Sequence, residues 1–209
     1  MYRPTAFRED RPDMLYEAIR AHPLGTLVTY GVSGLIANAV PFTLRVDPAY
    51  SVLRAHLANA NDQLVHLRQG SPVLVIFQGP QAYVSPSWYA TKREHGKVVP
   101  TWNYVVVQVH GTPIIIEDRQ WLREQIDELT SIHERGRAEP WSLDDAPEDF
   151  GAALMKGITG IEIPIERVEG KWKVSQNQPS ANRIGVECGL RADGHADMAD
   201  EVAIRKTDI

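Results

Sequence analysis

Residues 83–104 read YVSPSWYATKREHGKVVPTWNY, and this stretch carries most of the information about the fold and the site. It interleaves aromatic rings with hydroxyl groups and cations, and it follows a β-rich segment at 73–77. Hydroxyl and cationic groups bind phosphate monoesters through donated hydrogen bonds and charge, whereas flat rings pack against planar heterocycles. The stretch therefore predicts a loop that holds a phosphorylated aromatic cofactor.

The candidate binding residues in this stretch are hydroxyls, rings, one amide and one lysine. They are Ser85, Ser87, Trp88, Tyr89, Lys92, Thr101, Trp102 and Asn103. An equally open interpretation is that the rings fill the core of a barrel and that the charged residues form a solvated loop tip.

A second group of amides and cations follows a β-rich segment at 171–174. Its candidate binding residues are Lys173, Gln176, Asn177 and Arg183. Polar residues at strand ends often carry function, which favours a second wall of the same site. The alternative is an ordinary polar strand end followed by a helix cap.

The rest of the chain predicts a mainly β fold with interspersed helices. The expected strands are 25–30, 35–46, 51–57, 73–77, 81–85, 98–116, 158–168 and 171–174. The expected helices are 10–22, a short one after Asn61, 118–135, one around 152–156 and one near 181–190. Hairpin connections without a regular strand–helix alternation indicate an antiparallel barrel, closed or split.

Composition excludes several classes of protein. The 209 residues carry a formal net charge of -5, so DNA binding would need a local basic patch. Cys188 is the single cysteine, and the longest apolar run, 73–77, is too short to span a bilayer. With no signal-peptide pattern at the start, we expect a cytoplasmic protein. No phosphate-binding glycine loop and no metal-ligand spacing are present, so no metal is expected.

The chain resembles the PaiB family of FMN-binding negative transcriptional regulators, from the first residues to about position 190. The motifs that carry the resemblance are Ser85–Tyr89, His95–Tyr104, His56–Asn61 and Ser175–Gln178. The resemblance implies an FMN-binding split β-barrel, an antiparallel Greek-key barrel with peripheral helices, related to the pyridoxamine-phosphate-oxidase-like flavoproteins. It also implies a homodimer with FMN at the interface.

The same resemblance implies one FMN-binding domain over 1–190, and the composition of 191–209 predicts a polar tail that is frayed or used in dimer contacts. It places phosphate contacts in the turn that contains His56, Asn59 and Asn61. Family members often carry arginine where this chain has Asn59, so one cation is missing here. His56 has the alternative of being a hydrogen-bonded packing residue in a strand.

The function implied is that of a flavin- or redox-responsive module acting on gene expression. The alternative is an FMN-dependent oxidoreductase of the pyridoxamine-phosphate-oxidase-like class. Direct DNA contact is doubtful because no helix-turn-helix pattern is present. No catalytic residue can be identified, since a flavin carries out its own chemistry and requires no fixed set of catalytic side chains.

Overall fold

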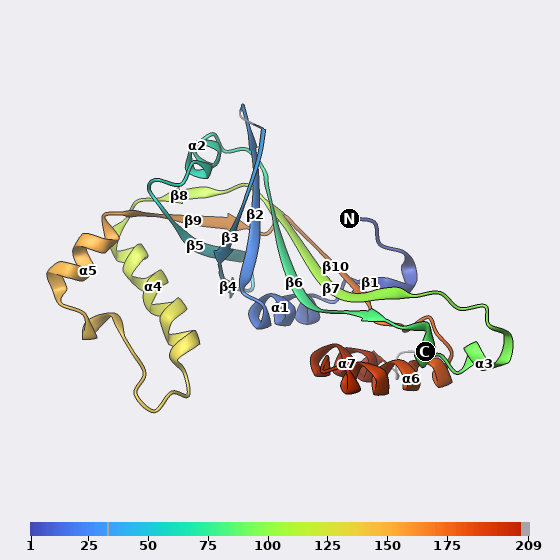
Figure 1. Ribbon diagram of the computed structural model, residues 1–209. Helices are drawn as coiled ribbons and strands as arrows, with labels where there is room; N and C mark the ends of the chain where they lie inside the picture. The colour runs from blue at the N-terminus through green and yellow to red at the C-terminus, as the bar shows by residue number, and fades with distance from the viewer. Residues whose placement is uncertain (33, 206–209) are drawn as a thin grey trace. The chain divides into compact units, whose positions relative to one another are not determined.

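The computed structural model describes residues 1–32 and 34–205, which divide into two compact units (Figure 1). Unit 1 consists of Met1–Ala18, Gln78–Val107 and the described part of Glu169–Ile209. Unit 2 consists of the described part of Ile19–Phe77 together with Gln108–Val168. The strands β6 (Val73–Val84), β7 (Thr101–Gly111) and β10 (Arg167–Lys173) each contribute residues to both units.

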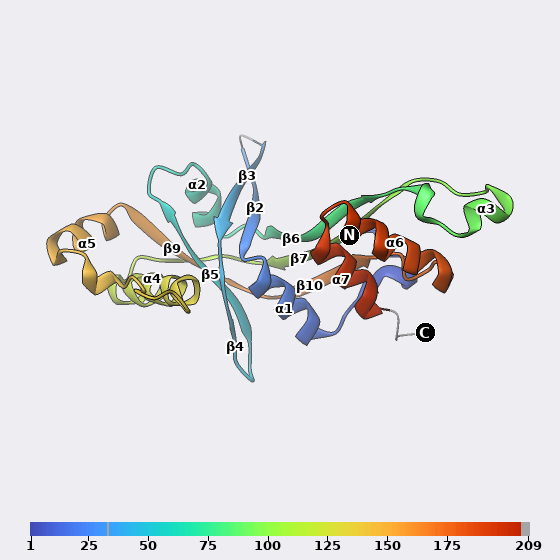
Figure 2. The same ribbon diagram turned by 60° about the horizontal axis from the view of Figure 1, so that its bottom comes forward.

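Unit 1 is built on an antiparallel sheet. The strand order is β1 (Arg8–Glu9), β10 (Arg167–Lys173), β7 and β6, and Glu9 lies opposite Gly170. Beyond β6 come the short helices η2 (Pro86–Trp88) and α3 (Thr91–His95). Helices α6 (Ser180–Ala192) and α7 (Ala196–Ile204) lie side by side (Figure 2). The N-terminal part adds η1 (Thr5–Phe7) and most of α1 (Pro12–Ala21).

The core of unit 1 is formed by residues that recur with the periodicity of a strand in β7 and of a helix in α6. Alternate side chains of β7 are buried, including Val105 and Val107, because successive residues of a strand face opposite sides. Val186 and Leu190 of α6 are buried at a spacing of four residues, which places them on one face of the helix. Trp172 of β10 is also buried, so strands and helices bury apolar side chains in unit 1.

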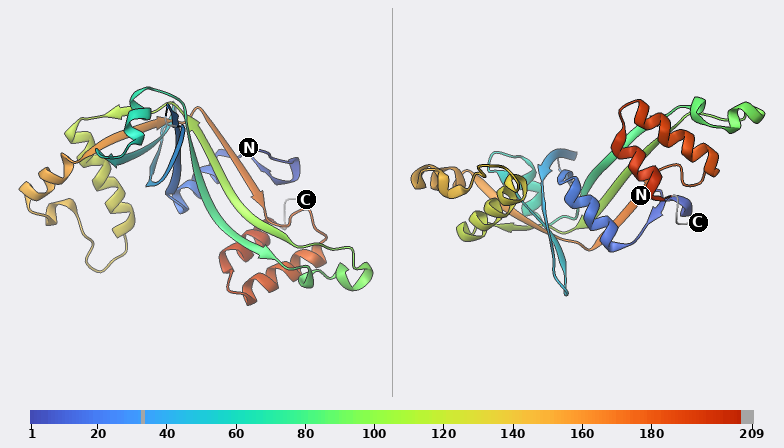
Figure 3. Two further views of the ribbon diagram at one scale, coloured as in Figure 1. Left: turned by 45° about the horizontal axis from the view of Figure 1, so that its top comes forward. Right: turned by 90° about the horizontal axis from the view of Figure 1, so that it is seen from below.

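Unit 2 contains a hairpin and a second antiparallel sheet. The hairpin of β2 (Leu24–Gly31) and β3 (Gly34–Pro41) pairs through β2 with β6. The second sheet has the order β4 (Thr43–Val46), β5 (Ser51–Ala58), β9 (Ile158–Pro164) and β8 (Ile114–Ile116). The helices are α2 (Gln63–Arg68), α4 (Arg119–Glu134), η3 (Leu143–Asp145) and α5 (Glu148–Met155). Figure 3 shows α4 and α5 as neighbours.

The predicted fold class, mainly β with antiparallel sheets and peripheral helices, is confirmed. The predicted strand 98–116 is divided, because β7 begins at Thr101 and ends before Pro113, which cannot donate a backbone hydrogen bond. Ser33, in the predicted hairpin turn, lies outside the described residues.

The segment from Arg191 onward, expected as a polar tail, is largely helical. Helix α6 extends to Ala192, and α7 buries Met198, Ala199 and Val202. Met198 and Val202 are four residues apart and so share a face, a pattern that the polar composition of the segment obscures. Residues 206–209 of the tail lie outside the described part of the chain. Among the described residues, no helix has the length and apolar character that crossing a membrane requires.

Candidate functional site

Unit 1 contains a cavity of about 410 Å³ lined by the loop after β6, the start of β7, the end of β10 and the start of α6. This volume lies within the range of roughly 300–1,000 Å³ that is usual for ligand pockets. Apolar side chains contribute part of the wall, among them Phe7, Val98 and Pro179. The remaining lining residues are mostly polar, and they determine which ligands the cavity can hold.

Lys173 is a cation of this cavity whose position is fixed by hydrogen bonds. Its ammonium group donates hydrogen bonds to the Thr101 hydroxyl and to the Trp102 carbonyl oxygen, the latter at 2.6 Å. Burial lowers the pKa of Lys173, and the positive charge of Lys171 lowers it further. Since an ammonium has three donors, one N–H of Lys173 remains for an anionic ligand.

The end of α3 and the residues that follow it add two further donors to the cavity. His95 Nδ1 accepts a hydrogen bond of 3.0 Å from the Lys97 backbone N–H. The proton of the neutral ring therefore lies on Nε2, which becomes a donor. Gly96 between them has φ 66°, a left-handed conformation that glycine adopts without strain, and it ends α3. This turn brings His95 and Lys97 to the same cavity.

Buried amides and hydroxyls hold the walls in place. Asn103 Nδ2 donates to the Ser175 hydroxyl over 2.9 Å, and Ser175 has φ 63°, the only described non-glycine residue with positive φ. Such a conformation costs free energy and often occurs at functional sites. Asn182 Oδ1 accepts the Thr91 backbone N–H at 3.1 Å, which ties the start of α3 to α6. The polar part of the cavity is therefore preorganised.

Tyr89 supplies a neutral hydroxyl next to these groups. Its side chain is 5% exposed, and burial raises the pKa of its phenol. The hydroxyl therefore stays protonated over the neutral pH range and can donate a hydrogen bond. With Lys173, Lys97 and the amides, the cavity can bind an anion that carries hydroxyl groups and a flat ring.

Five of the residues predicted from sequence line this one cavity. They are Tyr89, Thr101, Asn103, Lys173 and Asn177. The other eleven lining residues are absent from the sequence-based set; they are Phe7, Thr91, His95, Lys97, Val98, Val99, Pro100, Ser175, Gln178, Pro179 and Asn182. Several of them belong to the motifs His95–Tyr104 and Ser175–Gln178, so the motifs contained a signal for them. Phe7 comes from the distant N-terminal segment, and nothing in its local sequence indicates the cavity.

Three predicted residues of the 83–104 stretch form local contacts beside the cavity. Ser85 Oγ accepts the Ser87 backbone N–H at 3.2 Å and so caps η2. Lys92 Nζ donates to Ser87 Oγ over 3.1 Å in an exposed position. These three residues are not among those that line the cavity, and their role in binding stays a prediction.

Two predicted tryptophans have different surroundings. A Cβ atom added at Gly185 or Gly189 of α6 would overlap Trp88, so this tryptophan packs tightly on that helix. Trp102 is 49% exposed, and its indole N–H donates to Gln81 Oε1 at 3.0 Å.

Gln176 and Arg183 make structural hydrogen bonds within unit 1. Gln176 accepts the Val174 backbone N–H and donates to the Trp172 carbonyl oxygen, which fixes the turn after β10. Arg183 is buried and donates to the Arg205 carbonyl oxygen at 3.5 Å. Both residues therefore support the wall from which Lys173 and Asn177 project.

The three predicted residues of unit 2 all have partners within that unit. His56 Nδ1 lies 2.7 Å from Gln125 Oε1. Asn59 donates to the Lys156 carbonyl oxygen at 2.8 Å and accepts from the Thr159 hydroxyl at 2.7 Å. Asn61 Oδ1 accepts the Gln63 backbone N–H at 2.9 Å, at the start of α2. Their role as phosphate ligands stays a prediction.

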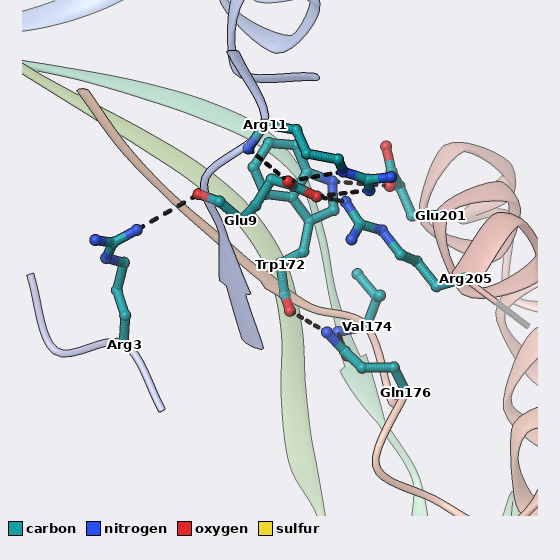
Figure 4. A network of polar contacts seen from close by, with 8 residues as sticks. All are labelled: Arg3, Glu9, Arg11, Trp172, Val174, Gln176, Glu201 and Arg205. Atoms are coloured by element: carbon teal, nitrogen blue, oxygen red, sulfur yellow. Dashed lines mark hydrogen bonds and ion pairs between the residues drawn. The ribbon is translucent and has the colours of Figure 1, made fainter. Parts of the chain in front are cut away.

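A charged cluster around Glu9 lies beside Trp172 of β10 (Figure 4). The carboxylate of Glu9 pairs with Arg11 at 2.8 Å and with Arg205 at 2.5 Å. Burial acts to raise the pKa of Glu9, but hydrogen bonds from Arg11 and Arg205 and the charge of Arg205 outweigh it and lower the pKa to about 2. The indole of Trp172 donates to Glu201, whose pKa is raised by burial. This cluster ties β1 to α7.

Comparison with known proteins identifies one matching family. A family model described as "Putative FMN-binding domain" matches residues 1–167. An uncharacterized protein of Emericella nidulans is 36% identical, over 91% of this chain and 90% of that protein. The protease synthase and sporulation protein PAI 2 of Bacillus subtilis is 30% identical, over 89% of this chain and 87% of that protein.

Solved structures share the fold at low sequence identity. The FAD and heme binding protein of Mycobacterium smegmatis has a TM-score of 0.59 and 18% identity, covering 79% of this chain and 72% of that chain. The flavocytochrome Anf3 of Azotobacter vinelandii has a TM-score of 0.62 and 13% identity, covering 83% of this chain and 72% of that chain. At these identities the likeness concerns the fold alone.

Proposed function

The chain belongs to the FMN-binding domain family, and from this premise we propose that it is a flavin-responsive module of the PaiB type that influences gene expression. FMN is the cofactor of the family. The support for a regulatory role is the relationship to PAI 2 of Bacillus subtilis, which is named for protease synthesis and sporulation. The formal net charge of -5 favours an indirect effect on transcription over direct contact with DNA.

The cavity of unit 1 fits FMN by the chemistry of its donors, and this observation carries our choice of site. Lys173 and Lys97 would hold the phosphate, with Thr101 and Asn103 among the hydroxyl and amide groups for the ribityl chain. The apolar wall and Tyr89 would face the ring system. Bound there, FMN would supply one- or two-electron redox chemistry, and the protein would supply binding and access.

A lysine substitution tests this site. In the variant Lys173→Met the cavity keeps its volume but loses a cation, so FMN affinity should fall roughly tenfold to a hundredfold, as expected for one charged hydrogen bond. Flavin fluorescence quenching on titration of the purified apoprotein measures the affinity. The matched control is Arg119→Met, since Arg119 is an exposed cation at the start of α4 in unit 2. Equal affinity in parent and Lys173→Met would exclude this cavity as the FMN site.

The variant Lys92→Ala tests the predicted loop separately. Lys92 contacts Ser87 and does not line the cavity. A loss of FMN affinity in Lys92→Ala alone would therefore indicate that the phosphate binds at the exposed loop. A loss in both lysine variants would extend the site over both segments.

A flavin-dependent oxidoreductase is the second candidate function. It is favoured by two proton donors in the same cavity, the Tyr89 hydroxyl and His95 Nε2. An assay of NADH and NADPH oxidation by the FMN-loaded protein, with acceptor dyes, separates the two functions. Turnover that His95→Gln reduces would favour the enzyme, whereas FMN binding without turnover would favour the module.

For the assembly we propose a homodimer. The hairpin of β2 and β3 exposes large apolar side chains, with Leu24 62%, Tyr30 67% and Leu35 73% exposed. Exposed apolar residues gathered on one element are typical of protein–protein contact surfaces. A cytoplasmic location is proposed on the lone, exposed thiol of Cys188. The single FMN-binding domain over 1–190 also stays a proposal.

A further inference from the structure

Unit 2 contains an apolar cavity whose lining residues differ from those of the proposed FMN site. It has a volume of about 350 Å³ and is bounded by β5, α4, η3, α5 and the start of β9. Among its described lining residues there is no Asp, Glu, Lys or Arg. The volume falls within the range of roughly 300–1,000 Å³ usual for small-molecule sites. The lining favours an uncharged ligand, because a charged one would lose its hydration without gaining a partner.

His56 is the main polar group in the lining of this cavity. Its Nδ1 lies 2.7 Å from Gln125 Oε1, so Nδ1 carries the proton of the neutral ring and donates it to the amide oxygen. Nε2 then has a lone pair and makes no hydrogen bond with any residue of the described chain. The imidazole therefore offers one fixed acceptor to a ligand.

The side-chain amide of Gln125, next to His56, has a nitrogen without a hydrogen-bond partner among the described residues. The residue is fully buried. A buried amide without a partner is costly, and such groups are uncommon unless they serve a purpose. Here the amide oxygen lies within hydrogen-bond distance of His56 Nδ1 and so orients the imidazole.

The other walls of the cavity are apolar and incompletely covered. Trp141 is 46% exposed, Phe150 56% and Leu154 58%. Gly151 of α5 also lines the cavity, and a Cβ atom added there would meet only Leu143 Cδ1, at 3.9 Å. Glycine within a helix is unfavourable, so at this position it leaves space at the expense of helix stability.

We propose that this cavity is a second ligand site and that it takes a flat, uncharged aromatic molecule with one hydrogen-bond donor. The Trp141 and Phe150 side chains provide surfaces for the ring. His56 Nε2 accepts the donor, and the absence of charged lining groups excludes an ionic ligand. The proposal rests on the proposed binding of FMN in the cavity of unit 1, because FMN at His56 would compete for this second cavity.

Three matched probes test the ligand class on the full chain saturated with FMN, so that the flavin site is already filled. They are 1-naphthol, 1-methoxynaphthalene, which lacks the donor, and 1-naphthoate, which is charged. Isothermal titration calorimetry should show binding of 1-naphthol, about tenfold weaker binding of 1-methoxynaphthalene and no measurable binding of 1-naphthoate. Tighter binding of 1-naphthoate than of 1-naphthol, or binding of none of the probes, would overturn the proposal.

Three variants locate the site. In Gly151→Leu the new side chain fills the cavity, so 1-naphthol binding should be lost while FMN affinity is kept. Gly151→Ala keeps the proposal testable if the larger residue prevents folding, and it should weaken binding partially. In His56→Phe the preference for 1-naphthol over 1-methoxynaphthalene should disappear. Unchanged 1-naphthol binding in both Gly151 variants would place the probe elsewhere and overturn the proposal.

A contact between two copies of the chain is the competing explanation for the exposed rings. Sedimentation velocity of Gly151→Leu and parent distinguishes the two. An altered oligomeric state of Gly151→Leu, without probe binding to the parent, would assign this face to a protein interface and refute the ligand site. The same oligomeric state in both proteins, together with loss of the probe from Gly151→Leu, supports the ligand site.

Discussion

At the scale of single residues, Glu9 illustrates how a buried charge depends on its partners. The carboxylate is 3% exposed and pairs with Arg11 and Arg205. A buried ion pair contributes little net stability by comparison with an apolar pair, yet removing one partner leaves a charge uncompensated and is strongly destabilising. Protonation of Glu9 and its substitution should therefore both lower the free energy of unfolding.

The lowered pKa of Glu9 makes the stability of the fold depend on acid pH. The pKa is about 2 in the folded chain and 4.5 in its ordinary state, so the folded form binds the proton less readily. The stabilisation is fully present above pH 4.5 and is lost as the pH falls toward about 2. Allowing for solvent screening, we expect a loss of about 2 kcal/mol from this group.

The variant Glu9→Gln provides the measurement. It should be less stable than the parent by roughly 3 kcal/mol at neutral pH. The difference should shrink as the pH falls from 4.5 to about 2, because the variant has no carboxyl to protonate there. Urea unfolding followed by circular dichroism at several pH values gives both free energies, with exposed Glu139→Gln as the control. A difference that stays constant with pH would contradict the assignment.

Residues that line the candidate cavity were predictable from the sequence where their chemistry was local. Lys173, Thr101 and Asn103 lie in motifs that combine cations, hydroxyls and amides, and all three line the cavity. The flat ring of Trp88 is a local signal for ring binding, but its packing depends on Gly185 and Gly189, about a hundred residues away along the chain. No local pattern reveals a contact of that sequence separation.

At the scale of elements, a helix with apolar residues along one face and a recognisable N-cap was predictable from the sequence. Short helices without these features were not. The predicted helix 118–135 corresponds to α4, which Asp118 caps by accepting the Trp121 backbone N–H at 2.8 Å. Helix α7 escaped prediction because it is short and rich in polar residues. Its few apolar residues are nevertheless buried, so tertiary packing stabilises a helix that composition alone does not indicate.

The packing of η2 on α6 gives an element-scale prediction. A Cβ atom at position 185 would overlap the Trp88 carbonyl oxygen, which is backbone and cannot rotate away. Gly185→Ala should therefore lower the free energy of unfolding by about 1–3 kcal/mol, as overpacking does. Gly151→Ala is the matched control, because its Cβ meets only Leu143 at 3.9 Å, and it should be neutral or stabilising by up to about 1 kcal/mol. Similar effects of the two substitutions in urea unfolding would disprove the tight contact.

At the scale of the whole molecule, the proposed homodimer can be tested at the edge strand β3. Leu35 is 73% exposed, so Leu35→Lys should leave the fold intact but place a charge in the contact. Sedimentation velocity should then show a shift from dimer to monomer, and FMN affinity should fall if the flavin lies at the interface. Ile184→Lys, on an exposed position of α6, is the control and should stay dimeric. A parent protein that sediments as a monomer would refute the homodimer.

The assignment of residues to the two units also limits how the chain can be divided. The chain passes between units at Ala18–Ile19, Phe77–Gln78, Val107–Gln108 and Val168–Glu169, and three of these points fall inside β6, β7 and β10. No single cut in the gene yields either unit complete. Laboratory chimeras that exchange one unit between relatives will therefore need several crossover points at once.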